Sequence, residues 1–190
     1  MWRDDDVAEL IARGAVDEAA THLIETRGPE ILGYLRGVLR DEGLAGDAFS
    51  MFCEGVWRGL PGFRGDASLR SWCYRVAWNI VLSIKKDAYW KRHDRLRTSM
   101  ASQLAGRIFS TTAVKRERES NALDRLKALL DSEEQTLLTL RLDRELSWSE
   151  IAEVLGEQDG TKSHDTALRK RFERLKEKLA SAARDEGLVD

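Results

Sequence analysis

The chain has 190 residues, of which 42% are hydrophobic and 34% are charged, and its formal net charge is −2. This length suits one large domain or two small ones with genuine hydrophobic cores. No apolar run approaches the roughly 18 residues of a membrane-spanning helix, and the acidic N-terminus MWRDDDVAEL contains no apolar signal region, so we expect a cytoplasmic protein without membrane insertion.

Residues 1–60 show the apolar spacing of helices, and no stretch alternates with the period of a strand. The pattern predicts a short helix around Val7–Ile11 and a second over Ala19–Leu39. We expect Gly28-Pro29 to interrupt or restart this second helix, because proline removes a backbone donor. A further amphipathic helix is predicted over Asp47–Leu60, ending at the Pro-Gly pair that follows.

The stretch Phe63–Arg92, FRGDASLRSWCYRVAWNIVLSIKKDAYWKR, has the most unusual composition in the chain. A glycine-containing loop leads into a helix with apolar residues at the three-and-four spacing of a buried stripe. That predicted stripe comprises Leu69, Trp72, Cys73, Val76, Ala77, Ile80, Val81 and Ile84. The residues turned away from it mix aromatic and cationic side chains: Arg70, Ser71, Tyr74, Arg75, Trp78, Lys85 and Lys86.

Two interpretations of this second face are open. Aromatic rings can stack on unpaired bases while cations hold phosphates, which is what a protein that binds single-stranded nucleic acid requires. Alternatively, Tyr74 and Trp78 widen the core stripe, and the cations are simply solvated.

Residues 94–118 carry few large apolar side chains and many Ser, Thr and Arg, which is the composition of a linker. We therefore predict a first domain over residues 1–95, a linker over 96–118 and a second domain over 119–190.

The second domain is predicted to contain a helix-turn-helix. A leucine stripe from Leu123 to Leu130 begins it, and two capping boxes, Asp131–Glu134 and Ser147–Glu150, each mark a helix start. After Gly156 and a polar turn, a last helix carries Leu, Phe and many cations. A basic helix after a glycine turn is the layout of a motif that enters the DNA major groove, although an ordinary helical hairpin has the same pattern.

The charges are unevenly distributed along the chain. Residues 67–118 hold 12 Lys and Arg against 3 Asp and Glu, and residues 162–178 hold 7 against 3. The flanking segments are acidic, with 7 against 13 over residues 1–66 and 4 against 11 over residues 119–161. Clustered cations of this kind indicate a polyanionic partner.

These residues carry a resemblance to a known family. The segment FRGDASLRSWCYRVAWN is similar to the second conserved region of bacterial sigma factors of the extracytoplasmic-function (ECF) class. The segment LDSEEQTLLTLRLDRELSWSEIAEVLG resembles the fourth region of the same proteins, in the same order. The resemblance covers roughly residues 10–95 and 119–182, with a short linker where larger sigma factors keep a third domain.

The resemblance implies a role for each segment. Residues that would bind the melted minus-ten element are Phe63, Arg64, Asp66, Ser68, Arg70, Tyr74, Arg75, Trp78, Asn79, Lys85 and Lys86. Residues that would read the minus-thirty-five element are Lys162, Ser163, His164, Thr166, Arg169, Lys170, Arg171, Arg174 and Lys178. Contacts with core RNA polymerase would come from Asp47, Glu54, Trp57 and Arg58.

The chain departs from the family in two places. The family usually has an acidic residue and a glutamine where this chain has Ser50-Met51, within the polymerase-binding helix. The turn before the basic helix is also longer than usual, which leaves the start of that helix open.

We therefore predict an all-α, two-domain transcription initiation factor whose partners are core RNA polymerase, promoter DNA and an anti-sigma factor. The alternatives are a sigma mimic that sequesters an anti-sigma factor without binding DNA, and a helix-turn-helix regulator. The sequence contains no phosphate loop and no nucleophile–base arrangement, and neither its two cysteines nor its three histidines have metal-ligand spacing, so we predict no enzymatic activity, no metal site and no cofactor.

Overall fold

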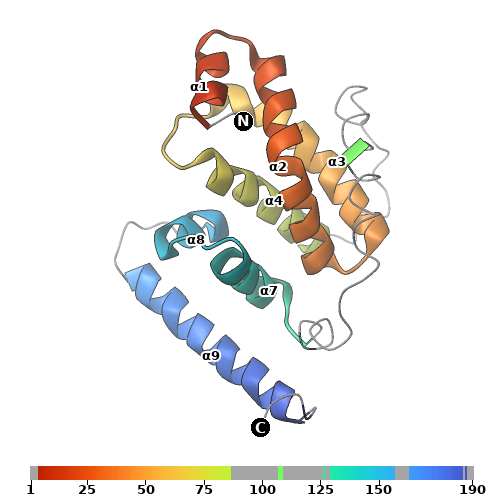
Figure 1. The fold of residues 1–190 in the computed structure, drawn as a ribbon, viewed down its shortest axis with the longest axis vertical. Helices are drawn as coiled ribbons and strands as arrows, with labels where there is room; N and C mark the ends of the chain where they lie inside the picture. Colours follow the sequence, from red (N-terminus) through yellow and green to blue (C-terminus); the bar gives the residue numbers. More distant parts are fainter. Residues whose placement is uncertain are drawn as a thin grey trace. The chain divides into compact units, whose positions relative to one another are not determined.

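The computed structural model describes residues 4–86, 107–108, 126, 129–156, 163–185 and 187 (Figure 1). It divides into two compact units, Met1–Arg116 and Glu117–Asp190, which we describe separately. All elements of the described residues are helical, so the predicted all-α class is confirmed. Of the predicted linker, Arg107 and Ile108 are described, and the rest lies outside the described residues.

The first unit is built around one long central helix (Figure 1). Its elements are α1 (Asp4–Ala12), α2 (Val16–Leu39), α3 (Glu42–Gly59), the 3-10 turn η1 (Leu60–Gly62) and α4 (Leu69–Lys86). Helix α2 contacts α1, α3 and α4, and α3 also contacts α4. Fully buried side chains from the three longer helices fill the core between them: Ile24, Leu35, Phe49, Phe52 and Tyr74.

Helix α2 continues through Pro29, so the predicted interruption there is wrong. A proline inside a helix costs about 3 kcal/mol because it loses one backbone hydrogen bond and crowds the preceding turn. Buried residues on both sides of the proline, Ile24 before it and Ile31 after it, anchor both halves of α2 in the same core and offset that cost.

Helix α3 begins earlier than the predicted Asp47. Arg40 takes a left-handed conformation with φ 55° and ends α2, and its N–H donates to the carbonyl of Arg36. Asp41 then caps α3, because its carboxylate accepts a hydrogen bond of 2.8 Å from the backbone N–H of Leu44. Side-chain capping of this kind fixes a helix start without any apolar signal, so apolar spacing alone placed the start too late.

The second unit contains a helical hairpin followed by a long helix. Its elements are α7 (Ser132–Leu138), the π-helical segment η3 (Thr139–Asp143), α8 (Trp148–Leu155) and α9 (Ser163–Asp185). Both predicted capping boxes are confirmed, at Asp131 and at Ser147. Gly156 ends α8 with φ 77°, a left-handed conformation that favours glycine.

The core of the second unit is formed by apolar residues from α7, η3, α8 and α9: Leu137, Leu140, Ile151, Leu168, Phe172 and Leu175. Of the apolar stripe predicted for the last helix, Leu168, Phe172 and Leu175 are buried as expected, whereas Leu179 is half-buried. Two leucines are instead exposed, Leu129 of the predicted leucine stripe at 51% and Leu142 at 57%. Leu142 lies in the π-helical segment, where the altered turn changes which residues face the core.

None of the helices in the described parts of the chain combines the length and the apolar character that crossing a bilayer requires. The same described residues contain no group of three or more His, Cys, Asp or Glu placed to hold a metal ion. Both cysteines are free and buried, and burial raises the pKa of the Cys53 thiol to about 12.

Candidate nucleic-acid interface

Two aromatic residues of α4 that were predicted to face away from the core are buried in the structure. Tyr74 has no exposed surface and Trp78 is 4% exposed, so neither can stack on a base in this conformation. The Tyr74 ring packs edge-on against Tyr34 of α2, with 5.3 Å between ring centres. Its hydroxyl group donates a hydrogen bond of 2.9 Å to Oε1 of Glu30. The phenol group is therefore satisfied inside the protein, and the interpretation that these two aromatics widen the core is correct.

The exposed face of α4 carries a different aromatic residue. Arg75, Asn79 and Lys86 are exposed, and Trp72, predicted to be buried, is only half-buried on the same side of the helix. The spacing of these four residues follows the three-and-four repeat of a single helical face. The Trp72 ring packs edge-on against Phe63, with 5.6 Å between ring centres. Apolar spacing alone could not identify Trp72, because it continues the stripe formed by Leu69 and Val76.

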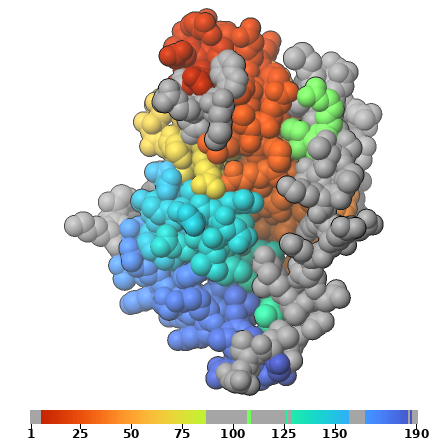
Figure 2. Space-filling model, in the orientation of Figure 1, coloured from red at the N-terminus to blue at the C-terminus, as the bar shows by residue number. Residues whose placement is uncertain are grey.

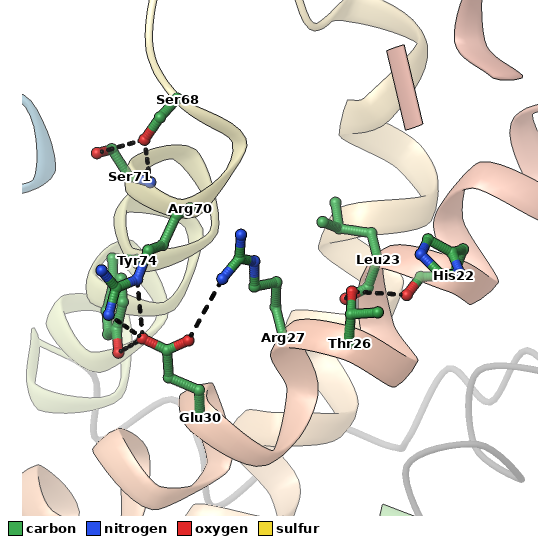
Figure 3. A network of polar contacts seen from close by, with 9 residues as sticks. All are labelled: His22, Leu23, Thr26, Arg27, Glu30, Ser68, Arg70, Ser71 and Tyr74. Carbon is green, nitrogen blue, oxygen red and sulfur yellow. Dashed lines mark hydrogen bonds and ion pairs between the residues drawn. The ribbon is translucent and has the colours of Figure 1, made fainter. Parts of the chain in front are cut away.

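Arg70, predicted to bind DNA, is held by an acidic residue of α2 (Figure 3). Its Nε and Nη2 atoms donate to Oε1 of Glu30 at 3.0 and 2.7 Å. The other carboxylate oxygen of Glu30 lies 3.9 Å from Nη1 of Arg27. Glu30 thus joins Arg70 and Tyr74, one turn apart on α4, to α2. No sequence signal identified this residue, since it lies far from α4 along the chain.

The loop before α4 is exposed at the surface of the first unit, where Figure 2 draws it in yellow. Arg64 and Asp66 are exposed, and Gly65 between them has φ 78°. Ser68, another predicted DNA contact, caps the helix: its Oγ accepts a hydrogen bond of 3.0 Å from the N–H of Ser71. The cap fixes the direction in which the loop leaves the helix.

Lys85, like Lys86, is exposed in the last turn of α4. Cations at this end of a helix are stabilised by its dipole.

The cations of α9 fall into two groups. Arg169, Lys170 and Arg174 are exposed, and α9 forms a continuous band of surface in Figure 2, in blue. In contrast, Arg171 pairs with Glu133, and Nζ of Lys178 lies 2.7 Å from Oε2 of Glu134. These two pairs join α9 to the first turn of α7.

The start of α9 is held close to α8 through Trp148. The guanidinium of Arg169 lies 5.5 Å from the Trp148 ring centre, and the Phe172 ring packs edge-on at 5.5 Å. Thr166 is exposed on the same turn. The predicted contact at Lys162 lies outside the described residues, as do the side chains of Ser163 and His164.

The predicted polymerase contacts lie along α3. Nε1 of Trp57 donates a hydrogen bond of 3.0 Å to Asp17 of α2, which fixes the half-buried indole at the surface. Nη2 of Arg58 lies 3.4 Å from Oε2 of Glu54, one turn earlier. Asp47 is half-buried. The four residues thus lie partly exposed on one helix.

Comparison with known proteins identifies the family. The Sigma-70 region 2 family matches residues 23–99, which include most of α2, all of α3 and all of α4. The RNA polymerase sigma factor YlaC of Bacillus subtilis (strain 168) is 31% identical over 134 residues, which cover 67% of this chain and 73% of that protein. The two findings agree with the helical fold and with the exposed basic surfaces. The chain belongs to the sigma-70 family of RNA polymerase sigma factors, in the extracytoplasmic-function class, and is a transcription initiation factor.

Proposed function

We propose that the first unit captures the melted strand of the minus-ten element. The observation that supports this most directly is the composition of one exposed surface: the Phe63–Trp72 pair lies on the same side of α4 as Arg75, Asn79 and Lys86. An aromatic edge can receive an unstacked base, and the amide of Asn79 can pair with a base edge. The two cations can neutralise neighbouring phosphates.

In this proposal Tyr74, Trp78 and Arg70 support the surface instead of contacting DNA. The two aromatics fill the core beneath α4, and Arg70 fixes the first turn of the helix to Glu30. Arg64 and Asp66, exposed on the loop that follows Phe63, are further contacts with the DNA in this proposal. A preorganised surface of this kind loses little conformational entropy when it binds a strand.

The second unit reads the minus-thirty-five duplex with the exposed side of α9. A helix-turn-helix places the N-terminal part of its second helix against base edges. Here that part carries Thr166, Arg169 and Lys170, and Arg174 follows one turn later. In this proposal Arg171 and Lys178, both initially predicted to contact the DNA, instead orient α9 through their ion pairs with α7.

Core RNA polymerase is bound through α3, by the partly exposed side chains of Asp47, Glu54, Trp57 and Arg58. The hydrogen bond from Trp57 to Asp17 holds the largest of them in place before binding. The expected anti-sigma factor remains a prediction.

Run-off transcription with purified core RNA polymerase on a random promoter library tests the proposal. We expect transcripts that depend on this protein and that start downstream of two shared sequence elements. A sigma mimic would give no transcripts and no DNA binding. A helix-turn-helix regulator would bind duplex DNA but would not bring polymerase to the promoter.

A further inference from the structure

A short piece of the predicted linker is docked on the first unit. Ile108 is 9% exposed, although it lies in a polar stretch of sequence. Beside it, Nη2 of Arg107 donates a hydrogen bond of 3.1 Å to Oε1 of Glu25 on α2. One buried aliphatic side chain and one ion pair therefore join this piece of chain to the middle of α2.

The docking site exists because α2 has a glycine at this point. A Cβ atom at Gly28 would lie 2.9 Å from Cδ1 of Ile108 and 3.1 Å from Cζ of Phe49. Both distances are shorter than ordinary van der Waals contacts between carbon atoms. Gly28 is buried in the middle of a helix, where glycine is otherwise unfavourable. Its missing side chain leaves the space that Ile108 fills over the Phe49 ring.

We propose that Gly28, Phe49 and Glu25 form a docking site for Arg107–Ile108, which anchors the connection between the two units. Ile108 lies 24 positions before Ser132, the first residue of α7, whereas Lys86, the last residue of α4, lies 46 positions before it. Docking therefore gives the chain a second fixed point on the first unit, about midway between α4 and α7 in sequence. Because two linked binding sites act together only over distances that their connection can reach, docking restricts the accepted separation of the two promoter elements.

This consequence rests on the proposed function, but the docking itself can be tested without DNA or polymerase. Hydrogen exchange of the full chain, followed by mass spectrometry, measures the protection of the backbone amide of residue 108. We expect Ile108→Ala to increase its exchange rate about tenfold or more, because the buried side chain holds the segment in place.

Gly28→Ala provides a second perturbation from the opposite side of the contact. The Phe49 ring is fully buried and stacked on Phe52, with 5.8 Å between ring centres, so Ile108 is the partner that must move. We expect faster exchange at Ile108 in this variant too. The double variant should exchange no faster than Ile108→Ala alone, since the shorter side chain at position 108 leaves room for the new methyl group.

Gly33→Ala is the matched control on the same helix. Nothing lies within 4 Å of a Cβ atom at Gly33, so this variant should leave exchange at Ile108 unchanged. Circular dichroism shows whether each variant remains folded. The docking site would be overturned if the backbone amide of residue 108 exchanged at the same rate in three proteins: the unaltered protein, Ile108→Ala and Gly28→Ala.

Transcription from promoters that differ only in the separation of the two elements tests the consequence. We expect Ile108→Ala to accept a wider range of separations than the unaltered protein. If hydrogen exchange shows that Ile108→Ala has lost docking but the range of accepted separations is unchanged, the proposed restriction on separation is overturned. If the unaltered protein directs no transcription while Ile108 is protected, the proposed function fails and the docking site stands.

Discussion

Replacing each of the two tryptophans of α4 by alanine separates the core from the DNA surface. Trp78 is 4% exposed, and truncation of a buried tryptophan costs about 3–5 kcal/mol of unfolding free energy. Trp72 is half-buried and makes one edge-on ring contact with Phe63. Its truncation should cost less, about 1–3 kcal/mol, from partial burial and one aromatic pair. Trp78→Ala is therefore the more destabilised variant.

The order reverses for binding of single-stranded DNA. If a base stacks on the Phe63–Trp72 edge, Trp72→Ala loses about 1–3 kcal/mol of affinity, which is about 5-fold to 150-fold in dissociation constant. Trp78 contacts no DNA in this proposal, so the folded fraction of Trp78→Ala should bind nearly as well as the unaltered protein.

Urea unfolding followed by circular dichroism gives the stabilities, and titration of a fluorescent minus-ten oligonucleotide gives the affinities. Duplex binding through α9 serves as an internal control, because both tryptophans belong to the first unit. The reasoning is refuted if Trp72→Ala is the less stable variant, or if it binds the oligonucleotide as tightly as the unaltered protein does.

Individual contacts give four further predictions. Tyr74→Phe should lower the unfolding free energy by about 1.5–3 kcal/mol, because it removes a buried hydrogen bond to a carboxylate; urea unfolding measures this. Lys170→Ala should reduce the salt dependence of duplex binding by about one unit, whereas Arg171→Ala, paired within the protein, should lower thermal stability and change the slope little. Ser147→Ala should cost about 1 kcal/mol in thermal unfolding through loss of the α8 cap. Since the pKa of Cys53 rises to about 12 on folding, the unfolded chain releases its proton first as pH increases; stability should fall above pH 9.0, and alkylation should be slow in the folded protein.

Features that depend on local sequence were predictable. The capping box at Ser147 places a hydroxyl group and a carboxylate three residues apart, and both of its hydrogen bonds form within that turn. The buried stripe of α9 was predictable for a related reason: its cations and its apolar residues occupy clearly different sides of the helix.

The orientation of α4 was not predictable in the same way, because apolar and aromatic residues occur on most of its sides. Two choices of buried face satisfy the three-and-four spacing, one with Trp72 inside and one with Trp78 inside. The choice is made by partners on α2: Tyr34 supplies a ring for Tyr74, and Glu30 supplies an acceptor for its hydroxyl group. Because Tyr34 and Glu30 lie far from α4 in sequence, no local pattern of residues can predict this pairing.

The same long-range contacts change which cations are available to DNA. A cation with an internal acidic partner, such as Arg70 or Lys178, must exchange that partner for a phosphate, so its net contribution to binding is small. Arg75, Lys86 and Lys170 have no acidic partner within the described parts of the chain. They can therefore neutralise phosphates, and so release the counterions bound to the DNA, without first breaking an ion pair within the protein. Affinity for promoter DNA should therefore follow the number of unpaired cations on α4 and α9, and not the charge of the basic segments.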